Sequence, residues 1–262
     1  MTDYTGLVTW DAIHRELETE LGERVTIDAL TGTWSIAQRV AGHRHSADDV
    51  LTADYALREM PTASEVLDLG TGIGGVGLLV LSRLPAAARL VCVEAQPISH
   101  RLLLANIAGN DLRDRVEPHL GDLRELALPS QFPLVTGSPP YFPLGTGILP
   151  DDSQKAHARF ELRGDVADYA RAAERHLAED GVFVFCFPTP QRARALAAVA
   201  AAGLIVSSYR DVIPRVSLRP LFTLFACRRT SPDLHIDPPL EVRHEDGRLT
   251  DEMQAVRRRF GF

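Results

Sequence analysis

Residues 66–75 read VLDLGTGIGG, an apolar run that ends in a cluster of glycines. The run has the length of a buried strand, and the apolar stretch 75–84 that follows the glycine cluster is predicted to be a helix. A second apolar run, 90–93, comes next and ends at Glu94. The order strand, helix, strand predicts one βαβ unit with parallel strands.

Strands and helices continue to alternate after this unit. Further strands are expected at 116–120, 134–136, 182–187, 204–209 and 221–227, and further helices at 97–108, 166–178 and 193–202. No helical pattern separates the last two strands, so they are expected to form an antiparallel hairpin at one edge of the sheet. The sequence therefore predicts an α/β fold whose mostly parallel sheet is covered by helices on both faces.

Three segments are expected along the chain. Residues 1–60 form an N-terminal extension packed on the core, with helices at 10–21 and 47–60 and a hairpin that turns at Thr31-Gly32. Residues 61–230 form the main domain. Residues 231–262 form a C-terminal extension with a strand, a turn at Asp246-Gly247 and a helix capped by Thr250.

The composition is that of a globular protein and excludes several classes. The 262 residues are 45% hydrophobic and 24% charged, which excludes disordered and fibrous chains. No apolar stretch is long enough to span a bilayer, and the first ten residues lack the pattern of a signal peptide, so we expect a cytoplasmic protein without a membrane partner. The three cysteines have no CxxC spacing, which predicts buried thiols and no metal site.

The charge is unevenly distributed. The net charge of −7 argues against indiscriminate binding to nucleic acid. Residues 185–230, however, hold seven arginines against Asp211 alone. Guanidinium groups suit phosphate contacts, so Arg192 and Arg194 are candidates for contacting a nucleic acid, although solvated surface charge is the simpler interpretation.

The glycine loop is typical of a cofactor site at the carboxyl edge of a sheet. It presents backbone N–H groups and a surface without side chains, so a nucleoside can approach closely. Glu94 lies 20 residues after Gly74, where a carboxylate accepts hydrogen bonds from a ribose diol. The loop lacks the dinucleotide pattern GxGxxG and is preceded by an acid, which favours the sulfonium compound S-adenosyl-L-methionine over NAD. We therefore expect the cofactor to be bound by Asp68, Gly70, Thr71, Gly72, Gly74, Glu94 and Asp122, the last accepting from the adenine amino group.

The string Ser138-Pro139-Pro140-Tyr141 follows the fourth predicted strand directly. The two prolines fix the backbone there and favour carbonyl groups that point into the crevice. The Ser138 hydroxyl and the Pro139 carbonyl can then accept hydrogen bonds from an exocyclic NH2 group, while the Tyr141 ring stacks on a planar base. These four residues are the candidate catalytic residues.

Together the glycine loop, Glu94, Gly121-Asp122 and the SPPY string resemble the S-adenosylmethionine-dependent amino-methyltransferases with an [N/D/S]PPY signature. The stretch 38–48 resembles the segment that precedes the fold in the bacterial tRNA adenine-N6 methyltransferases, which modify the adenine beside the valine-tRNA anticodon. The resemblance implies a Rossmann-like class I methyltransferase with seven strands and an antiparallel edge strand. It also implies tRNA as the partner.

One position departs from that subfamily, which has Asn where this chain has Ser138. Serine at this place is similar to the DNA cytosine-N4 methyltransferases, so the accepting base stays open. Methylation of a small-molecule acceptor or of a protein side-chain amide is the alternative activity. A non-catalytic S-adenosylmethionine-binding protein and a nicotinamide-binding domain are further alternatives.

Overall fold

The computed structural model describes residues 8–129, 131–230 and 233–262. Residues 1–7 lie outside this description, and the expected absence of a signal peptide rests on them. Ser231, where the C-terminal segment was predicted to start, also lies outside it. Within the described ranges no helix combines the length and the apolar character that crossing a membrane requires.

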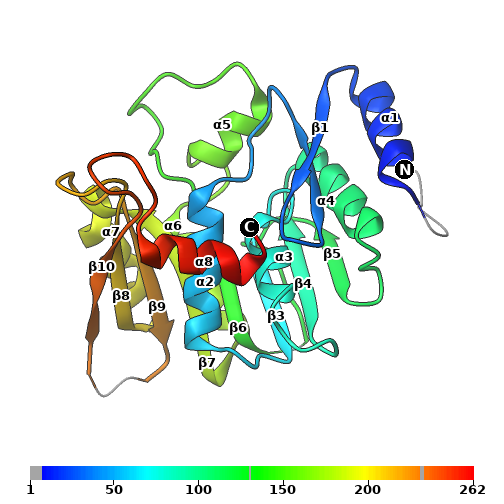
Figure 1. The fold of residues 1–262 in the computed structure, drawn as a ribbon. Helices are drawn as coiled ribbons and strands as arrows, with labels where there is room; N and C mark the ends of the chain where they lie inside the picture. Colours follow the sequence, from blue (N-terminus) through cyan, green and yellow to red (C-terminus); the bar gives the residue numbers. More distant parts are fainter. Residues whose placement is uncertain (1–7, 130, 231–232) are drawn as a thin grey trace.

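An eight-stranded sheet forms the centre of the molecule (Figure 1). Its order is β10-β8-β9-β7-β6-β3-β4-β5. The strands are β3 (Glu65–Leu69), β4 (Arg89–Glu94), β5 (Val116–Leu120), β6 (Phe132–Gly137), β7 (Leu177–Pro188), β8 (Ile205–Ile213), β9 (Phe222–Arg228) and β10 (His235–Glu241). All neighbouring pairs are parallel except those that β9 makes with β7 and β8. The predicted α/β, Rossmann-like fold with a mostly parallel sheet is confirmed.

Two details of the predicted sheet are wrong. The sheet has eight strands instead of seven, and the antiparallel strand β9 lies between β7 and β8 instead of at an edge. The edge is β10, which pairs in parallel with β8 and is irregular between Asp237 and Leu240. Pro238 and Pro239 interrupt this strand, and an edge strand tolerates proline because its outer N–H groups need no partner. A strand was expected in residues 231–262, but it was not counted as part of the sheet.

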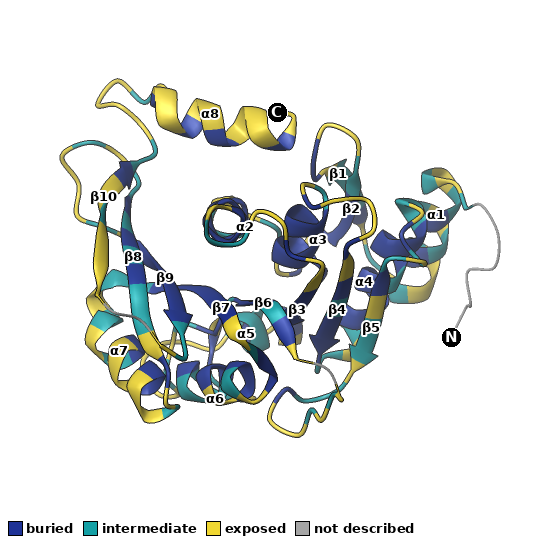
Figure 2. Cartoon of the chain, turned by 90° about the horizontal axis from the view of Figure 1, so that it is seen from below, coloured by how far each residue is buried: buried dark blue, intermediate teal, exposed yellow. Residues whose placement is uncertain are grey.

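Helices cover both faces of the sheet, as Figure 2 shows. On one face lie α2 (Ala47–Glu59), α3 (Gly75–Leu81) and α4 (Pro97–Gly109), with α8 (Asp251–Phe260) packed outside α2. On the other face lie α6 (Val166–His176) and α7 (Arg192–Ala201), which follows the short 3-10 helix η1 (Thr189–Gln191). Each face has its own cluster of buried apolar side chains.

The N-terminal elements pack on the first of these faces. Helix α1 (Trp10–Leu21) is followed by the hairpin β1 (Val25–Ala29) and β2 (Ser35–Arg39), and α4 contacts both α1 and β2. The helices at 10–21 and 47–60, the hairpin and the cap at Thr250 match the sequence prediction. The division of the chain into three segments stays a prediction.

Helix α5 (Ser153–Arg159), which was not predicted, is anchored to the N-terminal hairpin by one buried arginine. The Arg39 guanidinium donates to Asp152 at 2.7 Å, to Gln154 at 3.0 Å and to Glu23 at 2.5 Å. Gln154 is buried and also donates to the Ser99 hydroxyl of α4 at 3.0 Å. These bonds fix α5 above the carboxyl edge of the sheet.

Three stacked phenylalanines fill the core on the α6 and α7 side. The ring centroids of Phe183 and Phe185 lie 4.9 Å apart, as do those of Phe185 and Phe225, and all three rings are fully buried. Replacing Phe225 by alanine leaves a cavity and removes one stacked pair. We expect Phe225→Ala to lower the free energy of unfolding by about 3–5 kcal/mol.

The matched control is Leu221→Ala, because Leu221 is 59% exposed one residue before the same strand. It should change the free energy of unfolding by less than about 0.5 kcal/mol. Urea unfolding followed by circular dichroism measures both. Equal losses in the two variants would contradict the assignment of Phe225 to the core.

Candidate functional site

The carboxyl ends of β3, β4, β5 and β6 meet at one edge of the sheet, and a cleft opens there. Its space, open mouth included, is about 990 Å³. Among the predicted site residues, its walls include Asp68, Gly70, Thr71, Gly72, Glu94, Asp122, Ser138 and Pro140. Gly74, Pro139 and Tyr141 are not on the wall. The structure thus brings the glycine loop and two residues of the SPPY string, Ser138 and Pro140, to one cleft.

Asp68 lies beneath the glycine loop and holds it in place. One carboxylate oxygen accepts from the Thr71 hydroxyl at 2.5 Å and from the Gly77 N–H at 3.1 Å, and the other accepts from the Thr136 hydroxyl at 2.7 Å. Burial raises the pKa of this carboxyl group, and the three hydrogen bonds oppose that shift. Asp68 therefore links the start of α3 to β6, the strand that leads into SPPY.

Two glycines of the loop have different physical roles. Both Gly70 and Gly72 have φ +60°, a conformation that favours glycine. A Cβ atom on Gly70 would meet the Tyr169 hydroxyl, whereas no atom lies within 4 Å of a Cβ built on Gly72. Gly70 is thus required for packing against α6, and Gly72 leaves bare backbone facing open space.

Glu94 closes the glycine loop from the next strand. Its carboxylate accepts from the Gly72 N–H at 2.8 Å and from the Gln96 N–H at 2.7 Å. The side chain is 5% exposed, and burial raises its pKa. Each carboxylate oxygen has a second lone pair, so Glu94 can hold the loop and still accept from a ligand hydroxyl.

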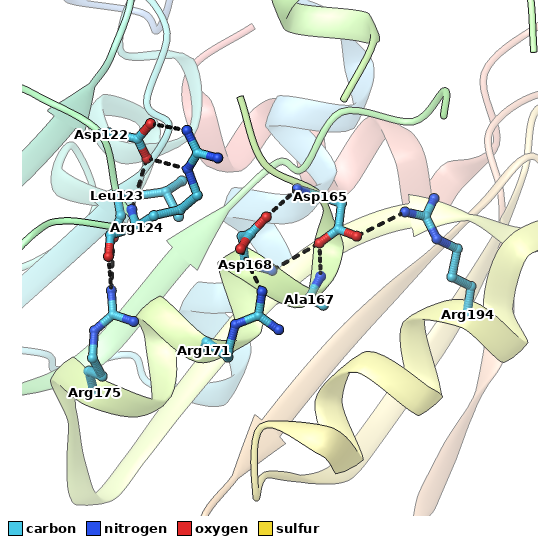
Figure 3. Close-up of polar contacts among 9 residues, drawn as sticks. All are labelled: Asp122, Leu123, Arg124, Asp165, Ala167, Asp168, Arg171, Arg175 and Arg194. Carbon is cyan, nitrogen blue, oxygen red and sulfur yellow. Dashed lines mark hydrogen bonds and ion pairs between the residues drawn. The ribbon is translucent and has the colours of Figure 1, made fainter. Parts of the chain in front are cut away.

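Asp122 follows β5 and is paired within its own loop (Figure 3). Its carboxylate accepts from Arg124 at 2.9 and 2.6 Å, and these bonds lower its pKa. Arg175 of α6 fixes the same loop by donating to the Leu123 carbonyl at 2.9 Å. Any ligand amine at Asp122 has to share the carboxylate with Arg124.

Tyr141 is held by its hydroxyl beside the cleft. The hydroxyl donates to the Asp48 carboxylate at 3.1 Å and lies 3.1 Å from the Cys186 sulfur. The ring meets Phe187 edge to face, with centroids 6.0 Å apart, and Gln191 donates to the Tyr141 carbonyl at 2.7 Å. These contacts fix the orientation of the ring.

Several cleft residues come from outside the glycine loop, Glu94, Asp122 and the SPPY string. His45 and Asp49 contribute from the start of α2, where their side chains lie 3.0 Å apart, and Gln154 contributes from α5. Tyr169 covers Gly70 from α6. Ser46 and Asp49 form a capping box at the start of α2. Nothing in the local sequence indicated Gln154 or Tyr169.

The donor set fits S-adenosyl-L-methionine. The carboxylate of Asp49 suits a sulfonium or an ammonium group, that of Glu94 suits ribose hydroxyls, and the bare backbone at Gly72 admits a nucleoside. The three cysteines are buried and free, as expected. In the described ranges no cluster of three or more His, Cys, Asp or Glu side chains is arranged to bind a metal ion.

The arginines of the 185–230 segment are mostly engaged in ion pairs. Arg192 pairs with Asp211, and Arg194 pairs with Glu161 at 2.5 Å. Arg210, Arg228 and Arg229 also pair with acids, namely Glu252, Glu59 and Glu174. Arg192 and Arg194 are thus already paired with carboxylates, which makes them less available to phosphates, and their contact with a nucleic acid stays a prediction.

The chain is similar in sequence to known methyltransferases. Residues 17–139 match the TRM5/TYW2 methyltransferase domain. Curated relatives called tRNA1(Val) (adenine(37)-N6)-methyltransferase include those of Actinobacillus pleuropneumoniae (25% identity, 61% of this chain, 66% of the relative), Phocaeicola vulgatus (27%, 68% and 74%) and Porphyromonas gingivalis (32%, 49% and 52%). The chain thus spans between half and three quarters of the length of these relatives.

Solved structures share the fold at lower sequence identity. A predicted O-methyltransferase of Agrobacterium tumefaciens has a TM-score of 0.63 at 20% identity, covering 82% of this chain and 97% of its own. Trm5b of Pyrococcus abyssi has a TM-score of 0.54 at 15% identity, covering 78% and 55%. Sequence and fold together confirm the predicted methyltransferase class, its cofactor S-adenosyl-L-methionine, and the resemblance to the tRNA adenine-N6 enzymes.

Glu94 provides a test of the cleft as the cofactor site. In Glu94→Gln one acceptor oxygen becomes an NH2 group facing backbone N–H donors, so the glycine loop loses a hydrogen bond worth about 1–2 kcal/mol. We expect the Kd for S-adenosylhomocysteine, measured by calorimetry, to rise about tenfold.

Glu125→Gln is the matched control, since it makes the same chemical change at an exposed residue of the loop after β5. Its Kd should equal that of the wild-type protein. A wild-type Kd for Glu94→Gln would remove Glu94 from the cofactor site.

Proposed function

We propose that the protein transfers a methyl group from S-adenosyl-L-methionine to an exocyclic amine of a nucleobase, namely N6 of an adenine in tRNA. The observation that carries the proposal is that Ser138 lines the same cleft as Gly70 and Gly72. A methyl donor on the glycine loop then lies next to an acceptor at SPPY. The curated relatives carry the adenine(37)-N6 activity on tRNA1(Val) in their names, and a tRNA substrate implies a cytoplasmic protein.

Glycine-loop and strand-end residues hold the methyl donor in this proposal. Glu94 accepts from the ribose hydroxyls, the bare backbone at Gly72 admits the nucleoside, and Asp122 accepts from the adenine amino group. Asp68, Thr71 and Gly74 act by shaping the loop. The bound sulfonium supplies an electrophilic methyl group, and the carboxylates of the cleft favour its positive charge.

SPPY residues orient the accepting amine. The lone pair of an aromatic amine is delocalised into its ring, so hydrogen bonds to the Ser138 hydroxyl and the Pro139 carbonyl favour a pyramidal nitrogen that can attack. The Tyr141 ring lies beside the cleft, where its hydroxyl contacts and Phe187 fix it, and in this proposal it stacks on the base that enters there. Such stacking contributes about 1–3 kcal/mol and offsets part of the cost of turning the base out of a folded RNA.

The direct test uses labelled S-adenosyl-L-methionine with unmodified tRNA, DNA, peptide and small-molecule pools. The methylated product is identified by mass spectrometry after digestion. The proposal predicts N6-methyladenosine from tRNA. N4-methylcytosine from DNA, or label only in the peptide or low-mass fraction, would contradict it.

Ser138→Ala tests the acceptor side of the site. Removing one acceptor of the amine should lower single-turnover methyl transfer by about 10²-fold, measured by rapid quench with saturating tRNA. The Kd for S-adenosylhomocysteine should not change, since no cofactor contact is assigned to this hydroxyl. A parallel loss of cofactor binding would show that Ser138 supports the loop instead of the acceptor.

The loop between β8 and β9 is the candidate surface for tRNA phosphates. Strand β8 is parallel to β7 through β9, so this loop lies at the same sheet edge as SPPY; Figure 1 shows it at the same end as α5. Arg215 and Arg219 are exposed on it, and neither forms an ion pair within the described part of the chain.

Replacing Arg215 and Arg219 together by alanine should therefore weaken tRNA binding and lower the slope of log Kd against log salt by about 1–2. The control is the pair Arg192→Ala and Arg194→Ala, whose charges are neutralised by Asp211 and Glu161. Filter binding at several salt concentrations measures both. If the control pair changed the slope of log Kd against log salt more than the Arg215 and Arg219 pair, the tRNA interface would lie at α7 instead.

A further inference from the structure

Four polar side chains form a continuous row behind the SPPY string. The Ser138 hydroxyl lies 3.8 Å from the Cys186 sulfur, which lies 3.1 Å from the Tyr141 hydroxyl. The Tyr141 hydroxyl in turn lies 3.1 Å from a carboxylate oxygen of Asp48. The row thus joins the acceptor side of the cleft, at SPPY, to the first turn of α2.

The middle of this row of side chains, at Cys186, is closed to solvent, whereas its end at Asp48 is not. Cys186 lies in β7 and is fully buried, whereas Asp48 is partly exposed and sits beside the exposed Ser46. Burial raises the pKa of the Cys186 thiol to about 12 and that of the Tyr141 hydroxyl well above its ordinary value. Both groups therefore keep their protons at neutral pH.

The donor and acceptor properties of the four groups fix the direction in which the hydrogen bonds of this row are donated. Ser138, Cys186 and Tyr141 can each donate one proton and accept another, whereas an ionised Asp48 only accepts. Tyr141 donates to Asp48, so the remaining donors point the same way, from Cys186 to Tyr141 and from Ser138 to Cys186. The Ser138 oxygen is then free to accept from an amine in the cleft.

We propose that Ser138, Cys186, Tyr141 and Asp48 form a proton relay that takes up the proton released when an amine is methylated in the cleft. The relay rests on the proposed amine methylation. The amine nitrogen bonds to the methyl carbon as the carbon–sulfur bond breaks, and that electron pair stays on sulfur. As this bond forms, positive charge builds up on the nitrogen and one of its protons leaves along the relay in the same step, so the relay affects the rate of methyl transfer.

Each relay member passes on one proton. The nitrogen gives its proton to the Ser138 oxygen, and the Ser138 hydroxyl proton moves to the Cys186 sulfur. The thiol proton moves to the Tyr141 oxygen, and the phenol proton moves to Asp48. Ser138, Cys186 and Tyr141 end neutral, and Asp48 ends as a carboxylic acid at the partly exposed end, where solvent can take the proton.

The relay gives a physical reason for serine, instead of asparagine, at position 138. A hydroxyl accepts one proton while it releases another, whereas the amide oxygen of the asparagine found in the tRNA subfamily accepts a hydrogen bond without passing a proton on. Ser138→Asn is therefore expected to keep the hydrogen bond to the amine and to interrupt the relay.

A matched pair of variants at Cys186 tests the relay. Serine keeps a group that accepts and donates, alanine does not, and both leave a similar small gap at a buried position. We expect Cys186→Ala and Tyr141→Phe to lower the single-turnover rate of methyl transfer by about 10²-fold. Cys186→Ser should retain a rate within about threefold of the wild type. Thermal unfolding and the Kd for S-adenosylhomocysteine identify any variant that fails to fold.

The pH dependence tests the far end of the relay. The groups that face Asp48 are Asp49 on α2, Tyr141 on the SPPY loop and Cys186 on β7. Burial and the Asp49 charge raise the pKa of Asp48. A protonated Asp48 cannot accept, so the wild-type single-turnover rate should rise with pH through that raised pKa and then level off. Asp48→Asn should be slow at every pH and lack this rise.

Failure of the relay and failure of the proposed function have different signatures. If the wild-type protein methylates no amine in any pool, the proposed function fails and the relay with it. If the wild type methylates an amine but Cys186→Ala matches Cys186→Ser, and Asp48→Asn keeps the wild-type pH profile, the relay alone is wrong. In that case the proton passes directly to water.

Discussion

The buried carboxylate of Asp68 is the constraint on which the site depends. It ties the glycine loop, through Thr71 and Gly77, to Thr136 on the neighbouring strand. Thr136 lies two residues before Ser138, so the loop that is to hold the methyl donor and the string that is to hold the acceptor share one anchor. A buried carboxylate is costly in isolation, and the three hydrogen bonds offset that cost. Removing the anchor would free each loop to move independently.

Local pattern and the rule for parallel strands were enough to predict much of the site. The glycines, Glu94 and SPPY each follow an apolar strand, and the carboxyl ends of parallel strands meet at one edge. The edge itself was mispredicted, because the strand expected in residues 231–262 was not counted in the sheet, where it pairs with β8 as β10. The antiparallel β9 was placed at that edge for the same reason.

Contacts between distant parts of the chain were beyond sequence reasoning. Gln154 joins Arg39 and Ser99, which are separated from it by 115 and 55 residues. Tyr169 of α6 packs on Gly70 of the glycine loop, and no sequence pattern near either residue predicts this contact. The Arg192 charge looked available along the chain, but Asp211 on the next strand neutralises it. Such partners are set by topology, which a local pattern does not contain.

The central claim is that one cleft holds the methyl donor beside an amine acceptor. A crystal structure with S-adenosylhomocysteine and adenosine tests it most directly. The account predicts ribose hydroxyls at Glu94, the thioether sulfur between Gly72 and Ser138, and the adenosine amine within hydrogen-bond distance of the Ser138 hydroxyl. S-adenosylhomocysteine bound away from the glycine loop, or an amine turned away from Ser138, would contradict the account.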